Sequence, residues 1–472
     1  MTKRTNPTRR RFMQLSGTVL GGIAVGTTVT AAQRIGRFIV ETKGGQTPEG
    51  VDVVHELPGA SFVIVEGSES ELENSKAVQD FAPDVEIRLD EPEVNDDAPT
   101  ADEASPENET LYGLQWDKQV QEVPGVHDVT QGEGTRVAII DSGVFADHPD
   151  LDVNVDLSRN FTGDGEGAGV PAGGDHGTHV AGIAAAQDSK TGVVGTAPET
   201  DLVDCRVFSY GPLASFADIL AAIVYSANID ADAANLSLGA YPIPRQGNGQ
   251  FYGKVLNSTM TYANKEGTLL SIAAGNDGAN LQGDGAVISL PNEGAQAVSV
   301  SATGPIGFEW GEEDFGDINE PPESPAFYTN YGTNAITVAA PGGDAYLPAI
   351  GVDENKDGEG DYDWFYDLVF NTTADVSFKY ETVPDGDDED DEPDQGPPID
   401  YLEAKPTYGW KAGTSMAAPQ VAGAAALIKS ENPDYNANQV EAVLKRTADV
   451  PDDYDKAYYG AGFVDLLEAV QD

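Results

Sequence analysis

The sequence predicts an α/β fold in which a parallel sheet of about seven strands is covered by helices on both faces. A small α+β domain is expected to precede it. From residue 111 onward, short apolar runs alternate with segments of helical periodicity. The apolar runs contain too few polar residues for either sheet face to lie in water, and strands buried on both faces are typical of parallel sheets. Residues 35–90 carry a pattern of shorter strands, which indicates a separate unit.

In the main domain, residues 111–472, buried strands are expected at 136–140, 202–208, 234–238, 269–274, 297–302 and 336–340. Helices are expected at 176–186, 215–228, 250–266, 415–430 and 438–447. In sheets of this kind, ligands bind beyond the carboxyl ends of the strands. Asp141 and Asn276 lie just past two such ends and are therefore candidate site residues.

Within residues 35–90, strands are expected at 37–41, 51–57, 61–65 and 84–89, with a helix at 68–81. Residues 91–110 are acidic and contain three prolines. This composition is typical of an exposed linker that is open to proteolytic cleavage.

Residues 1–34 have the composition of an export signal. Three consecutive arginines follow Thr8 in a twin-arginine pattern, and a mildly apolar segment over 15–29 ends in small residues near Ala32. No strongly apolar run of about 18 residues follows, so a membrane-spanning helix in the mature protein is not expected. We therefore expect a secreted, extracellular protein whose partners include the twin-arginine export machinery.

The chain is strongly acidic. It has 80 Asp and Glu residues against 26 Lys and Arg, a formal net charge of −54. Such a charge repels phosphate and excludes nucleic acid as an expected partner. In molar salt the Debye length falls to about 3 Å and screens this repulsion, so we expect a halophilic protein that loses structure in dilute buffer. The single cysteine, Cys205, lies in an apolar run, is expected in the core and cannot form an intramolecular disulfide.

The segment Gly413-Thr414-Ser415-Met416-Ala417-Ala418-Pro419 opens a run of small residues that reaches Ile428. A glycine turn that delivers a serine to the start of an apolar helix places its hydroxyl where unpaired N–H groups favour developing negative charge. A serine at a helix start is often only an N-cap. Three further motifs favour the interpretation of Ser415 as a nucleophile. They contain Asp141 (137–144), His176 (175–182) and Asn276 (273–278).

These motifs, in the order Asp, His, Asn, Ser, resemble those of the subtilisin family of serine proteases, and in particular its secreted halophilic members. The resemblance covers roughly residues 110–472 and implies a serine endopeptidase of broad specificity. It implies that Ser415 is the nucleophile, that His176 is its general base, and that Asp141 orients the imidazole. Asn276 and the backbone N–H of Ser415 would bind the oxyanion, and such a side-chain donor is typically worth about 10²- to 10³-fold in rate.

The same resemblance implies the substrate-binding residues. The segment with Ser237, Leu238 and Gly239 is similar to the family strand that pairs with an extended peptide. The small residues Ala273, Ala274 and Gly275 would line the pocket for the residue before the cut, with room for a large apolar or aromatic side chain. Asp277 at the rim would also favour a basic residue.

The resemblance further implies that residues 35–90 are an inhibitory propeptide, so the protein's own N-terminal part is an expected partner beside polypeptide substrates. Residues 42–50 are too short and too rich in Gly and Pro to form the first helix of the family pattern. We expect cleavage within 91–110. Residues about 351–408 exceed the family length and contain an acidic run at 385–392, which is expected to be a hydrated surface insertion, with a substrate-excluding lid as the alternative.

Structural calcium is the one expected cofactor, and none is expected for catalysis. Asp150 matches a calcium-binding segment of the family, although the accompanying loop 187–193 has Ser189 where family members commonly have Asn. A second candidate site at Asp353, Asn355 and Asp357 fits the first part of an EF-hand loop but lacks its closing glutamate.

Two other classes of function are compatible with parts of this pattern. A catalytically silent relative that binds peptide, or acts as a cell-surface scaffold, would keep the fold, but the four chemical positions are intact. An esterase of the α/β-hydrolase type requires a Gly-x-Ser-x-Gly elbow and the order Ser, Asp, His. The chain has neither at these positions.

Overall fold

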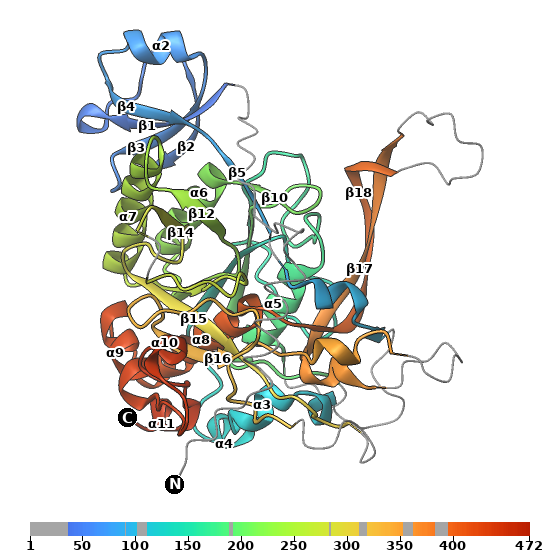
Figure 1. Cartoon of the computed structure of the whole chain (residues 1–472). Coiled ribbons are helices and arrows are strands. Elements are labelled where there is room, and N and C mark those ends of the chain that lie inside the picture. The colour runs from blue at the N-terminus through green and yellow to red at the C-terminus, as the bar shows by residue number, and fades with distance from the viewer. Residues whose placement is uncertain are drawn as a thin grey trace.

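The computed structural model describes residues 36–89, 91–101, 111–187, 192–282, 285–310, 319–352, 362–382 and 395–472. The predicted export signal and the candidate calcium residues Asp353, Asn355 and Asp357 lie outside these residues. Within the described chain, the centre is a seven-stranded sheet in which every neighbouring pair is parallel (Figure 1). In spatial order its strands are β16 (Val338–Pro341), β15 (Ala297–Thr303), β13 (Leu269–Ala273), β11 (Ala233–Leu236), β7 (Arg136–Asp141), β9 (Asp201–Arg206) and β8 (Arg159–Asn160).

Helices cover both faces of this sheet. The long ones are α5 (His176–Ala185), α6 (Phe216–Asn228), α7 (Gly249–Glu266), α8 (Thr414–Glu431) and α9 (Ala437–Thr447). Along β7, Val137 and Ile139 belong to one hydrophobic core with α5 and α8, whereas Ala138 and Ile140 belong to a second core with α6 and α7. Alternate residues of one strand are thus buried on opposite faces, as expected for a parallel sheet between two helical layers. The predicted α/β fold is confirmed.

Shorter elements complete the main domain. They are η3 (Leu111–Leu114), α3 (Trp116–Val120), α4 (Val123–His127), β10 (Leu213–Ser215), β12 (Ala240–Pro244), β14 (Val287–Leu290), η4 (Leu347–Ala349), η5 (Trp364–Asp367), α10 (Lys456–Tyr459) and α11 (Leu466–Gln471). Among the described residues, no helix combines the length and the apolar composition that crossing a membrane requires. Cys205 is fully buried in β9, as its apolar neighbours indicated.

The N-terminal part forms a small α+β domain of its own. Its antiparallel sheet has the order β2 (Asp52–Leu57), β3 (Phe62–Glu66), β1 (Arg37–Thr42), β4 (Val78–Pro83), with η1 (Lys43–Gly45) and α2 (Glu69–Asn74) between strands. The helix predicted at 68–81 is therefore wrong in its second half. The capping box of Ser68 and Glu71 starts the helix, but Val78 instead joins Val40 and Val65 in a small core, and β4 pairs with the free edge of β1.

This domain packs on α6 and α7 (Figure 1). Leu57 and Phe62 belong to the same hydrophobic core as both helices. Polar contacts add to this packing: the Ser258 hydroxyl donates to the Ala60 carbonyl over 3.2 Å, and Lys254 pairs with Glu41 at 2.6 Å. The N-terminal domain is thus joined to the main domain by apolar and charged contacts.

Two long strands, β17 (Val369–Thr382) and β18 (Gln395–Lys411), form an antiparallel hairpin that projects from the body (Figure 1). Its base is anchored by aromatic packing of Phe370 on Trp410 and by the buried His179, whose Nε2 atom lies 3.2 Å from the carbonyl oxygens of Val369 and Gly409. The acidic run 385–392 lies outside the described residues. The segments on either side of it, predicted only as a hydrated insertion, are largely ordered strand.

Candidate active site

Asp141 and His176 come together at the carboxyl edge of the sheet. Asp141 ends β7 and His176 begins α5, and the Oδ1 atom of Asp141 lies 2.7 Å from Nδ1 of His176. Both side chains are buried. Burial alone would lower the pKa of His176, but the adjacent Asp141 carboxylate and, further away, Glu91 hold this pKa above its ordinary value.

The sequence His176-Gly177 permits this approach. A Cβ atom on Gly177 would lie 2.6 Å from the carbonyl oxygen of Gly143, so only glycine lets the first turn of α5 pack against the loop after β7. The backbone N–H of Gly177 donates to the Ser142 hydroxyl over 2.8 Å. Residues next to the two candidate catalytic side chains thus fix the relative position of helix and strand.

Ser415 is the second residue of α8, and Thr414 separates it from Gly413. The φ angle of Gly413 is 152°, a value that favours glycine. The Ser415 hydroxyl donates to the Ser237 carbonyl over 3.3 Å, and the Ser237 hydroxyl donates back to the Ser415 carbonyl over 2.7 Å. Among the described residues, Nε2 of His176 has no hydrogen-bond partner, and the Glu91 carboxylate lies 3.8 Å from it. The serine and the histidine are therefore not hydrogen-bonded to each other in this state.

Asn276 follows β13 and lies beside the start of α8. Its Oδ1 atom accepts hydrogen bonds from both the backbone N–H and the hydroxyl of Thr414, each at 2.9 Å. Because both bonds are made by the amide oxygen, they fix the rotamer and identify the other end of the amide as its NH₂ donor. A donor held in this way is suited to stabilising a negatively charged oxygen.

A small pocket opens next to Ser415. It is lined by Leu238, Gly239, Ala240, Tyr241, Ala273, Gly275, Asn276, Asp277, Ser289, Thr414 and Ser415. Of the sequence-predicted substrate residues, Leu238, Gly239, Ala273 and Gly275 thus line the pocket. Ser237 and Ala274 are buried beside it and do not. Burial raises the pKa of Asp277 at the pocket wall, opposed by a hydrogen bond from Asn330.

The segment that leaves the N-terminal domain runs through this site. Strand β5 (Glu86–Arg88) pairs antiparallel with β10, and the Leu89 N–H donates to the Pro212 carbonyl over 2.8 Å. Further on, Asn95 in η2 (Glu93–Asp97) makes two hydrogen bonds with the backbone of Ala412, and β6 (Thr100–Ala101) pairs with β18. The beginning of the predicted linker is thus bound along the site rather than free of it.

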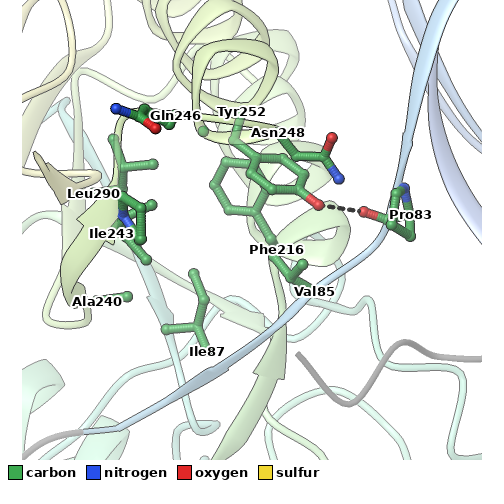
Figure 2. Close-up of a pocket in the computed structure, with 12 residues that line it drawn as sticks. Pro83, Val85, Ile87, Phe216, Ala240, Ile243, Gln246, Asn248, Tyr252 and Leu290 are labelled. Carbon is green, nitrogen blue, oxygen red and sulfur yellow. Dashed lines mark hydrogen bonds between the residues drawn. The ribbon is translucent and has the colours of Figure 1, made fainter. Parts of the chain in front are cut away.

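An apolar cavity of about 230 Å³ lies where β5 meets the main domain. Figure 2 shows Val85 and Ile87 on one side of it and Ile243 and Leu290 on the other, while the Tyr252 hydroxyl donates to the Pro83 carbonyl over 2.8 Å. Most of the side chains that line this cavity are apolar.

Asp150 is the one candidate calcium ligand that lies within the described residues. The Oδ2 atom of Asp150 accepts hydrogen bonds from the Tyr408 hydroxyl (2.8 Å) and from the Val193 N–H (3.1 Å). Donors directed at this oxygen use lone pairs that a cation would need. No group of three His, Cys, Asp or Glu side chains suited to a metal occurs in the described part of the chain. The described residues around Asp150 therefore do not fit a calcium site. Loop residues 188–191 lie outside the described residues. A calcium ion at this loop stays a prediction.

Three residues near His176 escaped the sequence reasoning. Lys411 lies with its Nζ atom 3.3 Å from Asp175 and 3.5 Å from Glu91. The available signals were weak: Lys411 stands four residues before Ser415 in a chain poor in cations, and Asp175 directly precedes His176. In the sequence, Glu91 stands out only as one of several acidic residues in 91–110. Tyr241 and Ser289 of the pocket had no signal in the sequence.

Comparison with known proteins identifies the family. The model of the subtilase family, Peptidase S8, matches residues 132–462. The chain is 27% identical to thermitase from Thermoactinomyces vulgaris, over 78% of this chain and 99% of thermitase. It is 28% identical to subtilisin Savinase from Lederbergia lenta, over 71% of this chain and 90% of that protein.

Among solved structures, the epidermin leader peptide processing serine protease from Staphylococcus aureus has a similar fold. The TM-score is 0.66 at 22% identity, and the match covers 92% of this chain and 97% of that one. Fervidolysin from Fervidobacterium pennivorans matches 93% of this chain and 61% of its own, with a TM-score of 0.60 at 19% identity. At these identities the two structures support the fold, and the family model supports the chemistry class. The chain therefore belongs to the subtilase family of subtilisin-like serine proteases.

Proposed function

We propose that this chain is the precursor of a secreted endopeptidase in which Ser415 attacks the carbonyl carbon of a peptide bond. His176 takes the serine proton at Nε2 and later gives it to the leaving amine. Asp141 holds the imidazole through Nδ1 and stabilises its charged form. Asn276 donates its amide N–H, together with the Ser415 backbone N–H, to the oxyanion.

The observation that carries this proposal is the buried contact of 2.7 Å between His176 and Asp141, at the same sheet edge as Ser415 and Asn276. A buried carboxylate bonded to Nδ1 fixes the tautomer with Nε2 as the acceptor. Nε2 has no hydrogen-bond partner among the described residues, which is the state a general base needs. The chain thus offers a nucleophile on α8, a base on α5 and an oxyanion donor in the loop that follows β13.

The N-terminal domain and its extension act as the inhibitor in this proposal. Residues 86–88 add a strand to β10, and Glu91 reaches the imidazole that must accept the serine proton. An extended peptide that pairs with β10 in this way occupies the place where a substrate peptide would bind. Cleavage after this segment and release of the domain would open the site.

Export and salt dependence complete the proposal. The twin-arginine pattern supports secretion. The charge of −54 supports function in concentrated salt, where carboxylate repulsion is screened.

The test is self-processing and casein hydrolysis by the precursor and by Ser415→Ala, in about 3 M NaCl. Ser430→Ala is a matched control, since it removes a hydroxyl from the far end of the same helix. We expect the wild type and the control to shorten on a gel and to digest casein, while Ser415→Ala stays full length and inactive. Casein hydrolysis by Ser415→Ala at the wild-type rate would refute the proposal.

A further inference from the structure

Asp175 stands directly before the candidate general base His176 and is the N-cap residue of α5. Its carbonyl accepts hydrogen bonds from the N–H groups of Thr178 and His179. An aspartate at this position ordinarily bonds to the first free N–H groups of the helix through its side chain. The Asp175 side chain makes no such bond, so its carboxylate is directed to other partners.

Both strands of the β17–β18 hairpin supply those partners. The Thr373 hydroxyl on β17 donates to Oδ2 of Asp175 over 2.6 Å, and Nζ of Lys411 on β18 lies 3.3 Å from the same oxygen. Partial burial opposes the charge of Asp175, but the Lys411 ammonium and the Thr373 hydroxyl lower the pKa of this carboxyl. Lys411 is only 13% exposed, and the Asp175 and Glu91 carboxylates raise its pKa against the effect of burial. Asp175 and Lys411 are thus a charged pair that is held in place.

Neutral hydrogen bonds hold the next residues of α5 on the same hairpin. The Thr372 hydroxyl donates to the Thr178 carbonyl over 2.8 Å. Nε2 of His179 lies 3.2 Å from one carbonyl oxygen on each strand. The first turn of α5 is also bonded to the loop after β7, through the Ser142 hydroxyl. The helix that carries His176 is therefore fixed by the hairpin as well as by the sheet.

The charged side chains that act on His176 come from several parts of the described structure. They are Asp141 at the end of β7, Asp175 before α5, Lys411 at the end of β18 and Glu91 in the segment that leaves the N-terminal domain. His179 lies one turn further along α5, and burial lowers its pKa to about 3, so it stays neutral. Asp175 and Lys411 contact each other within the main domain, so their pairing does not require the segment with Glu91.

We propose that Asp175 and Lys411 are a positioning pair, which holds the first turn of α5 on the β17–β18 hairpin and cancels charge beside His176. Both residues act through His176 and not on the substrate itself. The hairpin thereby supports the general base. This inference rests on the proposed function, because it concerns the base of the same reaction.

The two charges of the pair act on the imidazole in opposite directions. A carboxylate favours the imidazolium form and raises the pKa of His176, whereas an ammonium disfavours that form and lowers this pKa. Loss of Lys411 alone leaves the Asp175 carboxylate unopposed, so the His176 pKa should rise. Loss of Asp175 alone leaves the ammonium unopposed, so the same pKa should fall. A pair that only held the fold together would not produce opposite shifts.

The test measures the pKa of His176 by NMR in the uncut precursor. The background carries Ser415→Ala, which prevents self-processing, and Glu91→Gln, which removes the carboxylate that contacts both Lys411 and His176. The chain has only five histidines, so histidine-selective labelling gives few signals. Lys411→Met should raise the His176 pKa and Asp175→Asn should lower it, each by about 0.5 to 1 pH unit. The double variant should return it close to the background value.

Matched controls come from the exposed part of the same hairpin. Asp375 and Lys405 are cross-strand partners on β17 and β18, Asp375 is exposed, and Lys405 is 67% exposed. Asp375→Asn and Lys405→Met should leave the His176 pKa unchanged. Lys411→Arg keeps the cation and should titrate like the background. Each single variant gives its own shift, so misfolding of one leaves the other as a test.

Opposite shifts in the two single variants support the proposal. Shifts in the same direction, or shifts no larger than those of the controls, overturn it. In enzyme obtained by processing of the active precursor, the acid limb of kcat/KM should move in the same two directions, because the base must be neutral. A wild type that cleaves no peptide would count against the proposed protease function, whereas the NMR titration would still decide whether Asp175 and Lys411 act on His176.

Discussion

The Nδ1 atom of His176 lies 2.7 Å from the Oδ1 atom of Asp141, and this contact joins the start of α5 to the end of β7. The Asp141 side chain is fully buried, so its charge acts on the imidazole with little screening by water. This one relationship sets the protonation behaviour of the proposed general base.

The pH dependence follows from that contact. Burial lowers the pKa of His176, but the Asp141 carboxylate, with a further contribution from Glu91, holds this pKa above the ordinary histidine value of about 6.5. A general base must be neutral, hence kcat/KM is expected to fall as pH drops through this raised pKa. In a pH profile the acid limb should therefore lie above about pH 6.5. An acid limb below about pH 6.5 would contradict the assignment of His176 as the general base.

Asp141→Asn should reduce kcat by about 10⁴-fold, because the amide no longer stabilises the imidazolium and no longer fixes its tautomer. The acid limb should move to lower pH in this variant. Steady-state kinetics with a peptide substrate check both effects, and circular dichroism checks that the fold is kept. Residual activity near the wild-type level would remove Asp141 from the mechanism.

Asn276→Asp tests the oxyanion donor. The carboxylate keeps the acceptor for the Thr414 N–H and hydroxyl, so the local structure should survive. It loses the amide donor, and kcat is expected to fall by about 10²- to 10³-fold, with a smaller change in KM. An unchanged kcat would mean that Asn276 only caps the turn before α8.

Asp84 is predicted to hold the N-terminal domain on the main domain. It accepts hydrogen bonds from the Ser215 hydroxyl (2.6 Å) and from the Ala217 N–H (3.0 Å), and it lies 3.4 Å from Arg37. In the uncut Ser415→Ala precursor, Asp84→Ala should speed hydrogen exchange of β1–β4 amides by about tenfold or more. Asp80→Ala, an exposed acid on β4, is the control. Equal exchange in both variants would contradict the prediction.

The net charge of −54 predicts stabilisation by salt. Raising NaCl from about 0.1 M to about 3 M shortens the Debye length and screens carboxylate repulsion, so the thermal midpoint of the Ser415→Ala precursor should rise. Differential scanning calorimetry at the two concentrations measures it. Equal midpoints would show that the acidic surface does not make the fold salt-dependent.

Much of the central fold could be predicted because its strands are short apolar runs that end at distinct polar residues. Burial on both faces leaves a clear signal in segments such as 136–140. Strand β8 has only two residues and leaves no such signal in the sequence. The helix expected at 68–81 fails because its second half pairs with the edge of β1, and edge pairing depends on which strands meet in space. The β17–β18 hairpin also depends on pairing between segments, and the acidic run 385–392 that separates its two strands dominates the composition of this stretch of the sequence.

In the candidate site, too, some residues could be predicted from the sequence and others could not. Asp141, His176, Asn276 and Ser415 each stand in a local motif, so sequence order alone could single them out. Lys411 and Glu91 are separated by 320 positions and carry no motif, and only the path of the bound segment brings them within 3.5 Å. Ser237 and Ala274 belong to the same motifs and are buried beside the pocket, so their expected contact with substrate stays a prediction.

Labelling of the processed enzyme with a fluorophosphonate, followed by mass spectrometry to map the modified residue, tests directly whether Ser415 is the nucleophile. A single adduct is expected on Ser415, absent in Ser415→Ala and strongly reduced in Asp141→Asn. An adduct on another serine, or no adduct on an enzyme that digests casein, would contradict it.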